Sequence, residues 1–326
     1  MEKLFNEDSL VLSASYAETM ENSVLPFLKE RETDLTVDSF DAKPLFVSLF
    51  DAGKDARGTV FVVHGFTENA VKYSEIIYSL LRSGFSVVAY DQRGHGRSWR
   101  DERISDLSLT HVARFNDYVK DLDCVCKSVR DRMPKPWRVF AHSMGGAVTL
   151  LFLMKHKDVF DRAVLCAPMV AVNRRGIPYF TGRLICRAFK LLGKGRQRIF
   201  YSRPYSQRES FERACATGRE RFEWYNEIKH THPEFQNNGA SYSWVLASLG
   251  VSQKLLLPGR GKKIACPVML YSAGDDWEVM SGAQAMLIKR LKQGKIKTVQ
   301  GARHEIYRSD DETLFPWWHE VLAFLS

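Results

Sequence analysis

The stretch from residue 138 to residue 154 constrains the fold of this chain more than any other. An apolar run ends at Ala141, the sequence His-Ser-Met-Gly-Gly follows, and a helix-forming run continues to residue 154. This order predicts a strand, a sharp turn and a helix, with the Ser143 hydroxyl at the apex. Strand and helix backbones nearly touch in such a turn, so the residues two before and two after the serine must be small. Gly145 meets this need, and Ala141 stands where glycine is usual. The alternative is a buried serine in an ordinary strand-to-helix connection.

Short apolar strands alternate with helical patterns along most of the 326 residues. The strand-like runs are nearly continuous in apolar residues, as in strands buried on both faces of a mostly parallel, doubly wound α/β sheet. The expected strands cover residues 44–50, 58–63, 85–90, 138–141, 162–167, 265–272 and 296–299. The expected helices cover residues 16–28, 72–83, 112–133, 147–154, 282–292 and 314–325.

The alternation stops at Pro168 and resumes at Ala265. The intervening chain has helical stretches, scattered Gly and Pro, and no run typical of a buried strand. We therefore expect one α/β core formed by residues 1–168 and 265–326, with residues 169–264 inserted as a mainly helical cap.

Positive charge is concentrated in this expected cap. The net charge of the chain is +9, yet residues 169–264 contain 18 Lys and Arg against six Glu and no Asp, so the rest of the chain is slightly negative. A single basic segment suggests contact with an anionic surface, and we expect peripheral contact with anionic membrane. The alternative is that these basic side chains only form a solvated face on helices and bind no anionic surface. No nucleic-acid reading motif is present, so nucleic acid is not an expected partner.

Several classes of protein are disfavoured by what the sequence lacks. No apolar run approaches the roughly 20 residues that span a bilayer, and residues 1–32 do not resemble a secretory signal. Six cysteines are too few for a disulfide scaffold in a chain of this length, and no CxxC pair occurs. We therefore expect a cytoplasmic protein with reduced cysteines and with neither metal nor another cofactor.

Two side chains able to activate the serine follow later strands. A serine hydroxyl becomes a good nucleophile when an imidazole takes its proton and an acid holds that imidazole in the right tautomer. Asp275 and Asp276 follow one strand and His304 follows the next, so both loops are expected at the sheet edge that bears Ser143. Asp276 is preferred because it lies further along its loop, and Asp275 is the alternative.

Other histidines have different expected positions. His142 directly precedes the serine, so its side chain should point away from it. His64 and His95 lie in sheet-edge loops, where they can orient the substrate pocket. His230 and His232 lie in the expected cap and are interpreted as exposed polar residues.

A tetrahedral intermediate needs two backbone N–H donors. The N–H of Met144, directly after the serine, is one expected donor. The N–H of Phe66, in the turn after the strand over residues 58–63, is the other.

Three motifs resemble those of the monoglyceride-lipase-like α/β hydrolases: HGF at residues 64–66, DQRGHGRS at 91–98 and HSMGG at 142–146. Within that family, residues 71–73, 114–119, 239–245 and 301–306 resemble the bacterial lysophospholipases related to the enterobacterial inner-membrane enzyme. The resemblance spans roughly residues 40–326. It implies an α/β-hydrolase fold with a Ser-Asp-His triad that acts on a single acyl ester of a glycerol backbone. Ala141 and the doubled Asp275-Asp276 depart from the family pattern.

The expected cap should supply the substrate pocket. Its candidates for an apolar wall are Tyr179, Trp244, Ile177, Phe180, Phe189, Leu191 and Leu192. Guanidinium groups pair well with phosphate, so its candidates for head-group contact are Arg174, Arg175, Arg203 and Arg208. We therefore expect a lysophospholipid substrate.

Three alternatives stay open from the sequence. A monoacylglycerol lipase would use the same triad without a phosphate partner, and a general carboxylesterase would prefer short esters. A non-catalytic member would only bind a ligand in the pocket. A dehalogenase or epoxide hydrolase is disfavoured because those reactions need a carboxylate in place of Ser143.

Overall fold

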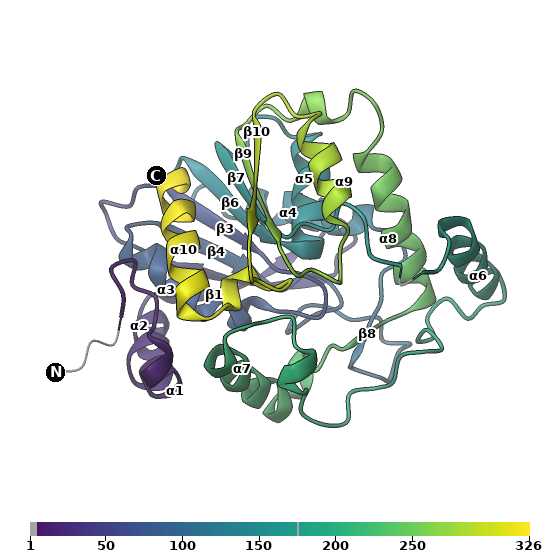
Figure 1. Cartoon of the computed structure of the whole chain (residues 1–326), viewed down its shortest axis with the longest axis horizontal. Coiled ribbons are helices and arrows are strands. Elements are labelled where there is room, and N and C mark those ends of the chain that lie inside the picture. Colours follow the sequence, from purple (N-terminus) through teal and green to yellow (C-terminus); the bar gives the residue numbers. More distant parts are fainter. Residues whose placement is uncertain (1–4, 175) are drawn as a thin grey trace.

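The computed structural model describes residues 5–174 and 176–326, and an eight-stranded sheet forms its centre (Figure 1). The strand order is β1-β2-β4-β3-β6-β7-β9-β10. All neighbours from β4 to β10 are parallel, whereas β2 runs antiparallel to both β1 and β4. The mostly parallel sheet predicted from the sequence is confirmed. Its strands are β1 (Glu32–Asp38), β2 (Pro44–Phe50), β3 (Thr59–Val63), β4 (Ser86–Tyr90), β6 (Trp137–His142), β7 (Arg162–Cys166), β9 (Val268–Ala273) and β10 (Gly294–Val299).

Side chains that alternate along the strands fill two apolar cores, one on each face of the sheet. In β3, Val60 and Val62 belong to one core, while Phe61 and Val63 belong to the other. The first core is covered by α1 (Tyr16–Thr19), α2 (Leu25–Lys29), α3 (Ser74–Arg82) and α10 (Asp311–Leu325). The second is covered by α4 (Asn116–Ser128), α5 (Ser143–Leu153), α8 (Tyr242–Leu255) and α9 (Ser281–Ile288). This is the layered arrangement of a doubly wound sheet.

Some element boundaries differ from the sequence-based expectation. Strand β1 was not expected, because most of its residues are polar and only Val37 is fully buried. Helix α4 is shorter than residues 112–133, since it begins at Asn116. The chain before α4 is held extended in β5 (Leu109–Thr110), which pairs with β8 (Gly239–Ala240). Helix α10 begins at Asp311 because the Asp310 carboxylate accepts the Thr313 N–H at 3.0 Å as an N-cap.

Residues 169–264 lie between β7 and β9 and, in the part of the chain that the structure describes, add no strand to the large sheet. They contain α6 (Tyr179–Leu191), α7 (Arg219–Thr231) and α8. Helix α8 packs on α5, α6 packs on α8, and α7 packs on α1. Figure 1 shows α6 at the periphery of the molecule. No helix among the described residues has the length and apolar character needed to cross a bilayer.

Candidate active site

Ser143 occupies the turn between β6 and α5 in a strained backbone conformation. Its φ of +49° lies in the left-handed region, which costs a non-glycine residue on the order of 1–3 kcal/mol. Gly145, two residues later, faces the end of β3, where an added Cβ would lie 2.1 Å from the Val63 carbonyl oxygen. Only glycine lets strand and helix approach this closely, as a nucleophile elbow requires.

His304 lies between Ser143 and Asp276. Its Nε2 is 2.8 Å from Ser143 Oγ, and its Nδ1 is 2.7 Å from Asp276 Oδ2. The other oxygen of Asp276 accepts the backbone N–H groups of Glu278 and Val279 at 2.8 and 3.1 Å, which orients the carboxylate. The structure therefore brings together the three side chains selected from the sequence. The contact to His304 comes from Asp276, whereas its neighbour in the doubled pair is exposed.

The two partners shift each other's pKa. Burial alone would raise the pKa of Asp276, but the hydrogen bond and charge of His304 outweigh it and lower that pKa below its usual value. Burial alone would lower the pKa of His304, but the hydrogen bond and charge of Asp276 raise it above 6.5. An ionised acid therefore orients a basic imidazole, which is the arrangement needed to take a proton from Ser143.

Two backbone N–H groups border the serine. Met144 is the second residue of α5, so its N–H has no acceptor within the helix. Phe66 follows β3 in a tight turn, and its N–H has no hydrogen-bond acceptor among the described residues. The carbonyl oxygens at the end of β3 approach Gly145 closely, which puts this turn beside the elbow. Both N–H groups can therefore donate to an oxyanion formed at Ser143.

His64 uses both ring nitrogens to hold this turn. Its Nδ1 donates to the Gly65 carbonyl at 2.7 Å, and its Nε2 accepts the Gln92 N–H at 2.9 Å. Burial lowers the pKa of His64, as suits a neutral ring with one donor and one acceptor. His95 packs against His64 with ring centroids 5.1 Å apart, and burial lowers its pKa well below the usual value. His142 points away from Ser143 as expected, and its ring faces Glu68.

Trp244, on α8, is the expected substrate-binding residue that the structure brings to the site. This residue is 6% exposed, and its ring packs against the Phe66 ring with centroids 4.0 Å apart and an interplanar angle of 35°. Tyr179 instead ties α6 to α8, because its hydroxyl donates to the Leu249 carbonyl at 3.3 Å. The Arg174 guanidinium lies 5.8 Å from the Tyr179 ring. Arg175 lies outside the described residues.

The expectation that Phe180, Leu191 and Leu192 form an acyl wall is wrong. These side chains are 80%, 79% and 72% exposed, because α6 turns its opposite face, with buried Cys186, toward α8. Arg208 forms an ion pair with Glu227 of α7. The sequence did not single out Glu68, which contacts residues on both sides of the triad.

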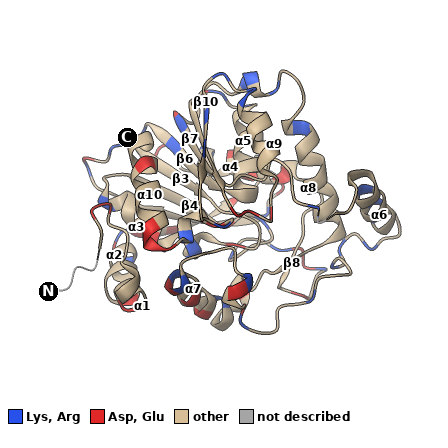
Figure 2. Ribbon diagram, in the orientation of Figure 1, with Lys and Arg blue, Asp and Glu red and all other residues tan. Residues whose placement is uncertain are grey.

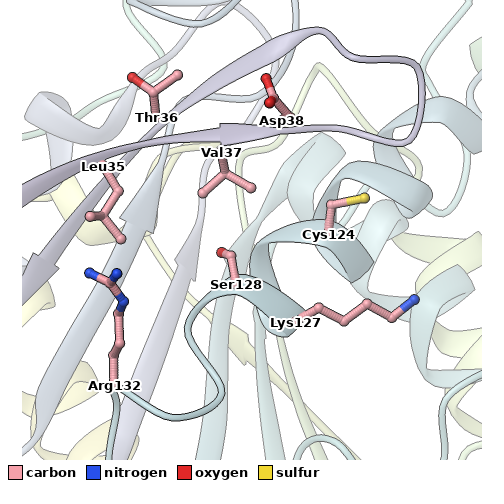
Figure 3. A pocket seen from close by; sticks show the side chains of 8 residues that line it. All are labelled: Leu35, Thr36, Val37, Asp38, Cys124, Lys127, Ser128 and Arg132. Atoms are coloured by element: carbon pink, nitrogen blue, oxygen red, sulfur yellow. The ribbon is translucent and has the colours of Figure 1, made fainter.

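A surface groove of about 530 Å³ lies between β1 and α4 (Figure 3). It is lined by Leu35, Thr36, Val37, Asp38, Cys124, Lys127, Ser128 and Arg132. None of these residues belongs to the triad or to the two turns beside it, so the groove is separate from the candidate active site. The described residues contain no group of three His, Cys, Asp or Glu able to hold a metal ion.

The sequence matches, over residues 54–311, the family described as serine aminopeptidase, S33. The chain belongs to this family. Lysophospholipase L2 of Escherichia coli (strain K12) is 31% identical over an alignment of 286 residues, and the match covers 82% of this chain and 80% of that protein. The monoacylglycerol lipase of Mycolicibacterium smegmatis is 23% identical, and the match covers 80% of this chain and 85% of that protein.

A solved structure of Saccharomyces cerevisiae monoglyceride lipase with a substrate analogue shares the fold. Its TM-score is 0.69 at 17% identity, over 90% of this chain and 95% of that chain. The resemblance to monoglyceride-lipase-like α/β hydrolases that the motifs indicated is therefore confirmed. As a member of the S33 family with this fold, the chain is a serine hydrolase.

Proposed function

We propose that this S33 family member is a lysophospholipase, which hydrolyses the single acyl ester of a lysophospholipid to a fatty acid and a glycerophospho-alcohol. The observation that carries the substrate assignment is the 31% identity to lysophospholipase L2 over 82% of the chain. The contacts among Ser143, His304 and Asp276 support ester cleavage through an acyl-enzyme.

In this proposal Ser143 Oγ attacks the ester carbonyl carbon while His304 Nε2, 2.8 Å away, takes its proton. The N–H groups of Phe66 and Met144 donate to the resulting oxyanion, and the loss of one such donor costs about 3–4 kcal/mol in an unrelated serine hydrolase. When the intermediate collapses, His304 gives the proton to the departing glycerophospho-alcohol, and the acyl group stays on Ser143. Water that loses a proton to the same imidazole then attacks this ester. When the second intermediate collapses, His304 returns that proton to Ser143 Oγ and the fatty acid leaves.

We assign residues 169–264 the role of a cap over the serine. The close contact between the Trp244 and Phe66 rings supports this role, because it brings α8 directly onto the oxyanion turn. Ser143 and His304 are 7% and 6% exposed, so an acyl chain would approach them between this cap and the core.

The same proposal includes docking of the cap on the cytoplasmic face of an anionic membrane through α6. Phe180, Leu184, Leu191 and Leu192 are each between 69% and 80% exposed. Residues 173–208 contain no Asp or Glu, and α6 carries only positive charges (Figure 2). An apolar face flanked by Lys and Arg fits a lipid surface with anionic head groups. The free state of all six cysteines supports a reducing, cytoplasmic location.

Monoacylglycerol hydrolysis is the second candidate. It is favoured by the 23% identity to the Mycolicibacterium smegmatis monoacylglycerol lipase over 80% of the chain. Such an enzyme would use the same triad and acyl site but would gain nothing from a phosphate on the substrate.

A panel of substrates separates these candidates. Rates with lysophosphatidylcholine, lysophosphatidylglycerol, monoolein and p-nitrophenyl butyrate are compared for the wild-type protein and for Ser143→Ala. We expect the highest kcat/KM with a lysophospholipid and at least a 1,000-fold loss in Ser143→Ala, a rough figure from other serine triads. Monoolein as the best substrate would support the second candidate. Full activity in Ser143→Ala would contradict both.

A further inference from the structure

Glu68 lies at the centre of a buried polar network beside the oxyanion turn. Its side chain is 3% exposed, and its Oε2 accepts the Gly65 N–H at 2.5 Å and the Tyr73 hydroxyl at 2.6 Å. Gly65 directly precedes Phe66, whose N–H is the proposed oxyanion donor. A Cβ on Gly65 would lie 2.7 Å from Glu68 Oε2, so this turn is packed tightly against the carboxylate.

The second oxygen of Glu68 reaches the loop that carries the catalytic histidine. Its Oε1 accepts the Tyr307 hydroxyl at 2.7 Å and the Lys72 ammonium at 3.1 Å. The same ammonium lies 2.6 Å from Glu305 Oε1. Since Glu305 and Tyr307 follow His304 within three residues, two contacts connect Glu68 to this loop.

His142 provides a third connection, directly to His304. Its Nδ1 lies 3.1 Å from Glu68 Oε2, and its Nε2 lies 3.2 Å from the His304 carbonyl oxygen. The ring therefore lies between the Glu68 carboxylate and the His304 backbone, within hydrogen-bond distance of both.

The network keeps Glu68 ionised. Burial would raise the pKa of this carboxyl group, but Lys72, His142 and the hydrogen bonds to it hold the pKa well below its usual value. An ionised carboxylate forms shorter and stronger hydrogen bonds than a neutral group, so it can hold several donors in one geometry.

We infer that Glu68 is a positioning residue for catalysis, which fixes the position of the oxyanion turn relative to the His304 loop. It touches neither the triad side chains nor the reacting atoms, and acts through Gly65, His142 and Tyr307. The oxyanion donors and the base act chiefly in the transition state, so their displacement lowers kcat more than it raises KM. This inference rests on the proposed ester hydrolysis but not on the lysophospholipid head group.

The test compares Glu68→Gln with Glu75→Gln in the full-length protein. Glu75 is a matched control, because it is 5% exposed and is held by Arg221, Tyr16 and the Val11 N–H. With p-nitrophenyl butyrate we expect Glu68→Gln to lower kcat by about 10- to 100-fold, up to the effect of losing one oxyanion donor, with KM within about twofold. Glu75→Gln should lower the Tm without lowering kcat more than about twofold.

Equal kcat losses in the two variants, or a loss confined to KM, would overturn the inference. If Glu68→Gln does not fold, Tyr307→Phe is used instead, since it removes a single hydrogen bond to Glu68. That variant should lose kcat several-fold at unchanged KM, and an unchanged kcat would contradict the positioning role. Because the assay uses a soluble ester, the outcome is independent of whether lysophospholipids are the preferred substrates.

Discussion

In the proposed mechanism, Asp276 sets the pH at which His304 can take a proton from Ser143. Only neutral imidazole is a base, and the carboxylate raises the pKa of His304 above 6.5. The kcat/KM of the wild-type protein should therefore rise with pH through a midpoint above 6.5. The interaction of Asp276 with protonated His304 also stabilises the fold. This stabilisation is complete below pH 6.5 and is lost as the pH rises through the folded-state pKa of His304.

Replacing the acid tests this assignment. In Asp276→Asn we expect kcat for p-nitrophenyl butyrate to fall by about 10⁴-fold, as when the orienting carboxylate of another serine triad is removed. The midpoint of the pH profile should also move down, because the group that raises the His304 pKa is gone. Asp275→Asn is the control and should leave both quantities unchanged. A larger loss in Asp275→Asn would show that the acid is assigned to the wrong neighbour.

Gly145 offers a second prediction at a single position. In Gly145→Ala the new methyl group would lie 2.1 Å from the Val63 carbonyl oxygen and 2.5 Å from that of His64, so the elbow must shift. Overpacking of this kind costs about 1–3 kcal/mol, and here it moves the nucleophile itself. The rate of Ser143 labelling by a fluorophosphonate should fall at least tenfold, on the order of what misplacement costs elsewhere.

The matched control for Gly145→Ala is Gly250→Ala. Gly250 lies inside α8, and a Cβ there meets no atom within 4 Å. Alanine in a helix interior gains about 1 kcal/mol over glycine, so this variant should melt at the same or a higher temperature and label at the wild-type rate. Equal labelling by both variants would mean that the close approach at Gly145 does not hold the serine in place.

Ser143 and Asp276 could be predicted because each follows a strand whose apolar run is visible in the sequence. His304 could be predicted because it follows the next expected strand, over residues 296–299, although that strand is mostly polar. Glu68 could not be predicted in this way. It lies in a loop, where a carboxylate is usually expected to be exposed to water. Its partners Tyr307 and His142 are distant in sequence. Only the folded chain brings these donors around one buried carboxylate.

At the scale of elements, periodicity predicts which residues share a face but not what covers that face. The helical stretches that the sequence indicates between residues 169 and 264 include α6. However, Phe180 and Leu191 lie on the side of α6 that faces solvent, whereas the side with Cys186 packs on α8. Strand β1 was missed for a similar reason. Its polar residues are held in a strand by hydrogen bonds to β2, and they show no alternation of apolar and polar residues that would predict a strand.

The exposed side of α6 makes a testable prediction. Burying one large apolar side chain contributes about 1.5–3 kcal/mol, so Phe180→Ser together with Leu191→Ser should weaken partition onto phosphatidylglycerol-containing vesicles by at least tenfold. Sedimentation with vesicles measures this change. Hydrolysis of p-nitrophenyl butyrate should be unaffected, because neither residue contacts the triad.

The control for the α6 variant is Met286→Ser, at a side chain of α9 that is 48% exposed. It removes an exposed apolar group from another helix and should not change vesicle binding. The positive charges around α6 should make binding weaker in high salt and on neutral lipid. Binding that responds to neither salt nor anionic lipid would contradict the docking surface.

At the scale of the whole molecule, Arg221 joins segments from both ends of the chain. This residue of α7 is fully buried, and its guanidinium contacts Glu75 at 2.9 Å, Asp311 at 2.7 Å and the Val11 carbonyl at 2.7 Å. These partners lie on α3, at the start of α10 and in the N-terminal segment. Helix α7 is therefore tied to the core by charge, whereas α6 packs on α8 through apolar contacts and hydrogen bonds such as that of Tyr179 to Leu249.

Removing this guanidinium should destabilise the whole fold. In Arg221→Met the Glu75 carboxylate would remain buried without its cation, a situation that costs about 3–5 kcal/mol. We expect the Tm to fall by several degrees, with the loss partly recovered in the double variant Arg221→Met/Glu75→Gln, because the unpaired charge is then removed as well.

The control is Arg219→Met, since Arg219 forms an exposed pair with Glu223 on the same helix. This variant should shift the unfolding free energy by less than about 1 kcal/mol. If the two single variants melted alike, Arg221 would not be the anchor of α7. A double variant as unstable as the sum of its two single variants would show that the two charges are not coupled.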